Sequence, residues 1–189
     1  MKNAYDFIVV GKGMMGAAAA RHLSRVTANI ALIGPDEPAD RGAHTGVFAS
    51  HYDSGRITRT IDGDPDWALL ANRSIARYRG IEAESGISFY SETGCLIAGP
   101  KPGGARDYLG PVLSVCERFG LDALLFDMAA INGRFPFFSF PAGSAGVFEA
   151  RGAGHIDPRR LVQAQVECAR RAGGRDCSFA GGSHRSRWG

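Results

Sequence analysis

Three short segments at the start of the chain carry the hydrophobic patterns of strand, helix and strand. Residues 5–10 and 29–33 are mainly apolar, as expected for parallel strands that are buried on both faces. Residues 17–23 begin with four consecutive alanines, which favour a helix with a small-residue face that packs tightly. Together the three segments predict a right-handed strand–helix–strand unit.

Three glycines, Gly11, Gly13 and Gly16, lie between the first strand and the helix. Gly11 allows a sharp turn after a strand, and Gly13 removes a side chain where a pyrophosphate approaches the backbone. Gly16 allows the helix to pack closely on the sheet, so that its N-terminal amides face the phosphates. The pattern favours a dinucleotide site, and an ordinary glycine turn between strand and helix is the alternative.

A long irregular segment and a predicted helix follow. Residues 34–59 are rich in Gly, Pro, Asp and His, and loops of this length usually serve a function. A helix is expected over residues 66–85, with Asp64 or Asp66 as its cap, Pro65 near its first turn and its end before Gly86. Its apolar positions recur at helical spacing: Trp67, Leu70, Ala71, Ile75, Tyr78 and Ile81.

The remaining segments predict a second domain and a closing helix. Short strands are expected over residues 87–90 and 94–99, a helix over 107–119, and irregular strands in a substrate-facing layer over 135–148. Asp157 and Pro158 begin a helix that runs to about residue 172. Residues 176–189 contain no apolar run, so we expect them to form an irregular or disordered tail.

Composition places the 189-residue chain among ordinary globular proteins, with 44% hydrophobic and 22% charged residues and no apolar stretch of membrane-spanning length. The net charge is +3, and residues 159–189 hold seven arginines without aromatic interleaving, which favours a solvated end over nucleic-acid binding. The first strand begins too early for a signal peptide to precede it. The cysteines lack zinc-site spacing, so we expect no metal, reduced thiols and a cytoplasmic location: Cys95, Cys116, Cys168 and Cys177.

Three further motifs identify a family. The loop over residues 49–59, the segment 94–100 and the helix start at 154–159 follow the glycine pattern in the order seen in one family. The chain resembles the FAD-dependent amine and amino-acid oxidoreductases typified by sarcosine oxidase and glycine oxidase. The resemblance implies an α/β fold, with a Rossmann-like FAD-binding domain over residues 1–85 and 150–175 and an inserted, partial α+β substrate domain over 86–149.

The same resemblance implies the site residues. Gly11, Gly13 and Gly16, with the backbone of Met14 and Met15, would hold the FAD pyrophosphate. Ser50, His51 and Arg56 match positions where the family's loop meets the flavin ring, and a cation such as Arg56 would stabilise the anionic reduced flavin during catalysis. Arg59 matches a position that binds the substrate carboxylate. From the residues alone, arginines three apart in a loop are usually surface charges, and His51 can be a structural loop histidine.

Two departures from the family pattern matter. Gly34 stands where the family has an acid that binds the adenosine ribose, and Asp36, twenty residues after Gly16, can take that role. Family members also continue well beyond the length of this chain. The expected activity is oxidation of a small amine or amino acid by a truncated form. The alternatives are a non-catalytic remnant with a nucleotide half-site and an NAD-type Rossmann protein.

Overall fold

The computed structural model describes residues 4–179, which form two compact units. Of the described residues, the first unit comprises 4–56, Gly80–Phe89 and 157–179, and the second comprises Ile57–Arg79 and Tyr90–Ile156. Each unit is therefore built from segments that are distant in the sequence.

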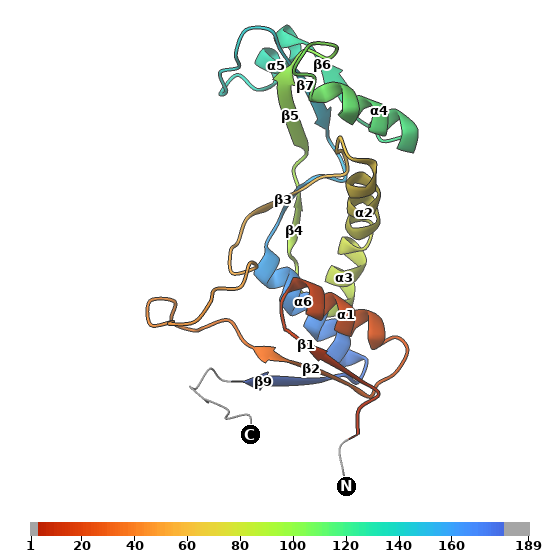
Figure 1. Cartoon of the computed structure of the whole chain (residues 1–189), viewed down its shortest axis with the longest axis vertical. Coiled ribbons are helices and arrows are strands. Elements are labelled where there is room, and N and C mark those ends of the chain that lie inside the picture. The colour runs from red at the N-terminus through yellow and green to blue at the C-terminus, as the bar shows by residue number, and fades with distance from the viewer. Residues whose placement is uncertain (1–3, 180–189) are drawn as a thin grey trace. The chain divides into compact units, whose positions relative to one another are not determined.

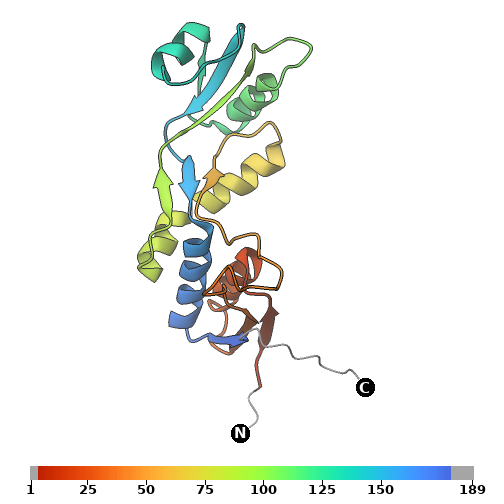
Figure 2. The same cartoon turned by 90° about the vertical axis from the view of Figure 1, so that its left-hand side faces the viewer.

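The first unit is a parallel sheet with two helices on one face (Figure 1). Strands β1 (Phe7–Val10), β2 (Ile30–Pro35) and β9 (Arg175–Phe179) lie in the order β1-β2-β9. Helices α1 (Met14–Leu23) and α6 (Pro158–Arg171) pack against each other, and both lie on the same side of the strands (Figure 2). The strand–helix–strand unit that the sequence predicts is present.

The core of this sheet explains the small-residue face of α1. Ala20 of α1 and Ala169 of α6 are buried with Ile30 and Leu32 of β2, and side chains of β1, α1 and α6 surround them. Because alanine adds little bulk, both helices can approach the sheet closely. Arg21 of α1 is also buried, and its Nε donates a hydrogen bond to Oε1 of Gln165 on α6.

Strand β9 differs from the sequence expectation of an irregular segment. Residues 175–179 pair in parallel with β2, with Ala31 opposite Arg175. Backbone hydrogen bonds hold a short edge strand in place, so the strand can form without an apolar run. A search for hydrophobic patterns therefore does not find it. The expected tail over 180–189 lies outside the described residues.

The second unit contains two small sheets and three helices among its described residues. Strands β3 (Arg56–Thr58), β8 (Gly154–Ile156) and β4 (Tyr90–Glu92) form one sheet. The other has the order β5-β7-β6 and is antiparallel: Cys95–Pro100, Ser144–Glu149 and Leu124–Phe126. Helices α4 (Leu109–Phe119) and α5 (Met128–Arg134) accompany this sheet, and β6 and α5 have no counterpart in the sequence prediction.

Residues 66–85 form two helices, whereas the sequence predicts one. Helix α2 (Pro65–Ile75) starts from Asp64, whose side chain accepts hydrogen bonds from the amides of Asp66 and Trp67. At its end the Arg77 amide bonds to the Ser74 carbonyl, three residues back, which tightens the turn and separates α3 (Tyr78–Ser85). Apolar spacing alone does not reveal such a break, because both helices keep the same periodicity.

Residues 57–79 group with the second unit, whereas the sequence placed them in the FAD-binding domain. Ile61 explains this difference, because it is fully buried in a cluster with Leu109, Val112 and Val147. The segment between β3 and α2 therefore belongs to the core of the second unit.

Candidate functional site

The turn between β1 and α1 requires glycine at two of its three glycine positions. Gly11 has a φ of +111°, which L side chains rarely adopt, and its amide donates to the Ile33 carbonyl at 2.7 Å. A Cβ on Gly16 would lie 1.7 Å from the Gly11 carbonyl oxygen. The backbone of the turn therefore excludes any side chain at position 16.

Gly13 is different, because the described part of the chain leaves room for a side chain there. Its φ of −79° and ψ of −169° are open to any residue, and an added Cβ would meet only His51, at an ordinary contact distance of 3.7 Å. The fold by itself thus gives no reason for glycine at position 13.

Gly13 is also the N-cap residue of α1, and among the described residues no side-chain hydrogen bond caps this helix. The amides of Met14, Met15 and Gly16 lie in the first turn, where an α-helix offers no intrahelical acceptor. No acidic residue occupies that turn either. The partial positive charge of the helix end is therefore suited to an anion.

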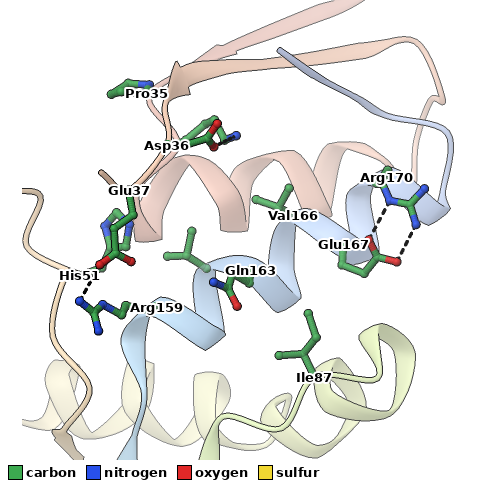
Figure 3. A pocket seen from close by; sticks show the side chains of 12 residues that line it. Pro35, Asp36, Glu37, His51, Ile87, Arg159, Gln163, Val166, Glu167 and Arg170 are labelled. Atoms are coloured by element: carbon green, nitrogen blue, oxygen red, sulfur yellow. Dashed lines mark hydrogen bonds and ion pairs between the residues drawn. The ribbon is translucent and has the colours of Figure 1, made fainter. Parts of the chain in front are cut away.

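A cleft of about 510 Å³ lies within the first unit, between the end of β2 and helix α6 (Figure 3). Charged side chains face it in pairs. Lys12 Nζ lies 2.6 Å from Asp36 Oδ1, and Arg159 lies 2.6 Å from Glu37 Oε1. Glu167 and Arg170 form a third pair, at 2.7 Å. The cleft is thus polar but close to neutral in charge.

Gly34 leaves no space for a side chain at its position in β2. A Cβ on Gly34 would lie 2.7 Å from the backbone nitrogen of Lys12. Asp36 lies just beyond the end of β2, and its side chain is 59% exposed while Lys12 is only 8% exposed. The buried ammonium of Lys12 therefore holds an accessible carboxylate beside the cleft.

His51 is buried in the wall of the same cleft, with 7% of its surface exposed. Its Nδ1 has no hydrogen-bond partner within residues 4–179. The ring packs edge-on against Tyr52, at a centroid distance of 4.6 Å, and the Tyr52 hydroxyl donates to the Asp36 carbonyl. Burial lowers the pKa of His51, and nearby Arg56 lowers it further, while Glu37 and Asp53 oppose the shift.

Arg56 is half-buried and holds its own loop together. Its guanidinium donates to the Ser50 carbonyl and to Asp53 Oδ2, at 2.5 Å in each case. It also lies 3.5 Å from the Met14 sulfur, at the start of α1. Ser50 thus contributes a carbonyl to the loop, and Arg56 connects that loop to the glycine turn.

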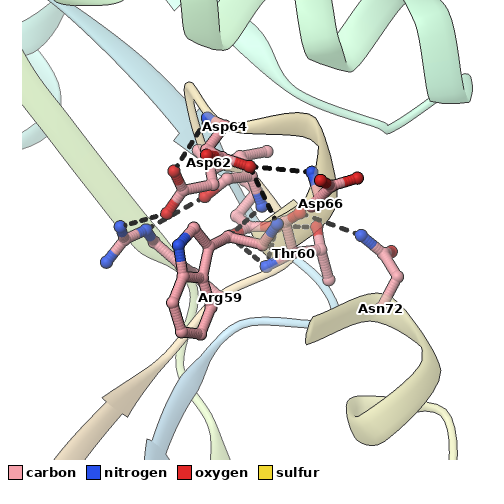
Figure 4. Close-up of polar contacts among 9 residues, drawn as sticks. Arg59, Thr60, Asp62, Asp64, Asp66 and Asn72 are labelled. Atoms are coloured by element: carbon pink, nitrogen blue, oxygen red, sulfur yellow. Dashed lines mark hydrogen bonds and ion pairs between the residues drawn. The ribbon is translucent and has the colours of Figure 1, made fainter. Parts of the chain in front are cut away.

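Arg59 belongs to the second unit. Its Nε donates to the Ile61 carbonyl at 3.0 Å, and its Nη2 lies 2.6 Å from Asp62 Oδ2 (Figure 4). Glu149, at 1% exposure, accepts hydrogen bonds from the Thr60 amide at 3.0 Å, from the Thr60 hydroxyl and from the Ile61 amide. Burial raises the pKa of Glu149, and the bonds from Thr60 oppose that rise.

Sequence reasoning gave no site role to four of these charged residues: Lys12, Glu37, Arg159 and Glu149. The first lies inside the glycine pattern, and the last ends an apolar run over residues 145–148. Both positions are unusual for a charged side chain, and this departure from the pattern is the sequence signal by which the two residues can be recognised.

Comparison with known proteins identifies the family. A family model described as "FAD dependent oxidoreductase" (DAO) matches residues 6–177, and the chain belongs to this family. The family resemblance and the α/β, Rossmann-like fold class expected from the sequence are thereby confirmed.

Among its relatives is monomeric sarcosine oxidase from Arthrobacter sp. (strain TE1826), 28% identical over 180 residues that cover 95% of this chain and 44% of the relative. N-methyl-L-tryptophan oxidase from Yersinia pestis (strain Pestoides F) is 24% identical over 170 residues, 89% of this chain and 43% of the relative. The chain thus spans less than half the length of these relatives.

Solved structures share the fold. L-proline dehydrogenase from P. horikoshii superposes with a TM-score of 0.69 at 17% identity, over 92% of this chain and 44% of the other. Glycine oxidase from Geobacillus kaustophilus gives a TM-score of 0.67 at 20% identity, over 92% and 46% of the two chains. In residues 4–179 of the present chain, no helix combines the length and apolarity needed to cross a membrane.

Proposed function

We propose that this chain binds FAD through its first unit and is part of a flavoenzyme that oxidises the C–N bond of a small amine or amino acid. The carrying observation is Gly13, whose missing side chain has no structural reason within the described residues. A dinucleotide supplies the reason, because its diphosphate must approach the uncapped end of α1 closely.

The residues of the first unit suit the parts of FAD. The turn with Gly11, Gly13 and Gly16 and the amides of Met14 and Met15 would hold the diphosphate. Asp36, held by Lys12, would accept the ribose hydroxyls in place of the acid that Gly34 displaces. Ser50, His51 and Arg56 would border the inner part of the cofactor, since their loop is tied to the start of α1.

The redox chemistry would come from the cofactor, since FAD, when held here, would supply the acceptor for the hydride that leaves the carbon next to the amine nitrogen. Arg56 would supply a positive charge that stabilises the reduced, anionic flavin. Sarcosine and N-methyl-L-tryptophan, named for two relatives, are both N-methyl amino acids. Arg59 in the second unit would bind the carboxylate of such a substrate through its planar guanidinium.

The domain roles follow from this assignment. Residues 1–85 and 150–175 would contain the FAD-binding domain and 86–149 part of the substrate domain, except that 57–79 belong to the second unit. Neither a nucleic acid nor a membrane belongs to this function. Cys95, Cys116 and Cys168 are free thiols, which suits a cytoplasmic enzyme.

The test is flavin retention by the purified chain, with Gly13→Ala as the key variant. We expect the wild type to keep flavin absorbance through gel filtration and to be stabilised against heat by FAD more than by NAD. Gly13→Ala should keep the fold, because the added Cβ fits, but should lose at least tenfold in FAD affinity.

Three results would contradict the proposal. Protection by NAD alone would favour the NAD-type alternative, and no binding of either nucleotide would favour the non-catalytic remnant. Unchanged FAD affinity in a folded Gly13→Ala protein would remove the observation on which the assignment rests.

A further inference from the structure

The unpartnered Nδ1 of His51 is the starting point. A buried ring nitrogen without a hydrogen bond costs free energy, and such groups are uncommon in folded proteins. His51 is more than nine-tenths buried, and nothing within residues 4–179 bonds to its Nδ1. This indicates that a group absent from the chain itself completes the contact.

The location of His51 indicates which kind of group this is. Nδ1 lies 3.7 Å from the Cβ position of Gly13, so the imidazole borders the space that this glycine leaves open. Gly13 is the uncapped N-terminal residue of the ten-residue helix α1. The ring nitrogen and the helix end therefore face the same space, and both suit an anion.

Each neighbouring charged side chain forms an ion pair, and among them Nε of Arg159 has no hydrogen-bond partner within the described residues. Arg56 pairs with Asp53, Lys12 with Asp36 and Arg159 with Glu37. Figure 3 shows Glu37 directly beside His51, with Arg159 next to them on α6. The imidazole thus stands between groups of both signs: Glu37, Asp36 and Asp53 are acidic, and Lys12, Arg56 and Arg159 are basic.

Burial also affects protonation. It lowers the pKa of His51, and the carboxylates of Glu37 and Asp53 oppose this only in part. In the free protein, burial therefore favours the uncharged ring. A diphosphate beside Nδ1 would raise the pKa of His51, because an adjacent negative charge stabilises imidazolium.

We propose that His51 binds the diphosphate of the dinucleotide and takes up one proton from solvent as the nucleotide binds. The imidazolium then donates from Nδ1 to a phosphate oxygen, while the first-turn amides of α1 donate to the same group. This rests on the proposed function and differs from the family resemblance, which places His51 at the flavin ring. His51 thereby makes nucleotide affinity dependent on pH.

Calorimetric titration with FAD and with ADP tests the proposal directly. At pH 7, in buffers of different ionisation enthalpy, the binding of either ligand should be accompanied by the uptake of close to one proton by the protein. Between the pKa values of free and bound His51, affinity should fall by up to about tenfold per pH unit as pH rises. The binding of riboflavin, which lacks the diphosphate, should cause no proton uptake.

Two variants provide the matched comparison. His51→Asn keeps an amide nitrogen near the position of Nδ1 but does not titrate, so it should abolish both the proton uptake and the pH dependence. His44→Asn alters a histidine of the same loop that does not line the cleft, and it should leave both unchanged. If His51→Asn fails to fold, an NMR titration of wild-type His51 with and without ADP replaces it and should show a raised pKa with ADP.

The outcomes separate this proposal from the previous one. FAD binding without proton uptake, or unchanged pH dependence in His51→Asn, overturns the role of His51 and leaves the FAD assignment standing. Proton uptake on riboflavin binding would indicate that His51 contacts the flavin ring, as the family resemblance implies, and not the diphosphate. If neither FAD nor ADP binds at any pH, both proposals fail.

Discussion

The polar groups around α1 and those around Arg59 differ in one respect. In the second unit, the Thr60 and Ile61 amides, the Thr60 hydroxyl and the Arg59 guanidinium all have partners in Glu149, Asp62 or the backbone. In the first unit, Nδ1 of His51 and the end of α1 have none among the described residues. The network around Arg59 stabilises a loop, and a substrate carboxylate bound there would share the guanidinium with Asp62. The groups around α1 instead leave donors and acceptors unused for a ligand.

The largest effect is expected from Glu149, which should act on stability. Glu149→Ala leaves the Thr60 and Ile61 amides unpaired and creates a cavity, so we expect a loss of about 3 to 4 kcal/mol in the free energy of unfolding. Urea denaturation measures this loss, with Glu117→Ala on the surface of α4 as the control. A loss equal to that of the control would show that the network does not hold the loop.

The pH dependence of the same group has a definite sign. Because burial raises the pKa of Glu149 in the folded protein, folding binds a proton, and stability is largest below the ordinary carboxyl pKa. Stability should then fall as pH rises through the raised value. Thermal unfolding between pH 4 and 8 measures this, and Glu149→Gln should flatten the profile.

The glycine turn gives the next largest effect and contrasts two neighbouring positions. Gly16→Ala places a Cβ 1.7 Å from the Gly11 oxygen and should destabilise the chain by about 3 kcal/mol. Gly13→Ala should cost no more than about 1 kcal/mol, the usual effect at a helix cap. Chemical denaturation of both variants without nucleotide measures the difference, and equal losses would mean that Gly13 is also a structural glycine.

A smaller effect is expected from Asp36. Asp36→Ala removes a charged acceptor of ribose hydroxyls and should weaken ADP binding by about tenfold, or roughly 1.4 kcal/mol. Binding of inorganic pyrophosphate, which has no ribose, should be unchanged. Equal weakening of both ligands would show that Asp36 acts through Lys12 and not on the ribose.

Glu167 should have the smallest effect, because it lies in a closed ion cluster at the rim of the cleft. Hydrogen bonds from Arg170 and then Arg171 hold the pKa of its carboxyl at about 2. Replacing both arginines with alanine should return the titration midpoint toward 4.5, as carbon-detected NMR would measure, while ADP affinity stays the same. A change in ADP affinity would mean that this cluster takes part in nucleotide binding together with His51 and the start of α1.

Several elements could be predicted from sequence because their signals are local. Asp157 and Pro158 predict the start of α6, where Asp157 Oδ1 accepts from the Arg160 amide. The apolar runs predict β1 and β2 for the same reason. Strand β9 and the break between α2 and α3 could not be predicted, because backbone pairing and a tightened turn leave no hydrophobic period.

The sequence by itself determined the family, the glycine turn and the set of candidate residues, because spacing and residue type carry that information along the chain. Only the tertiary structure decided that Gly11 and Gly16 serve the backbone while Gly13 leaves space open. It also decided that Lys12 holds Asp36, that Glu149 closes the Arg59 loop and that His51 faces α1. These contacts join residues far apart in the chain, so burial and distance, which sequence spacing does not encode, select among the candidates.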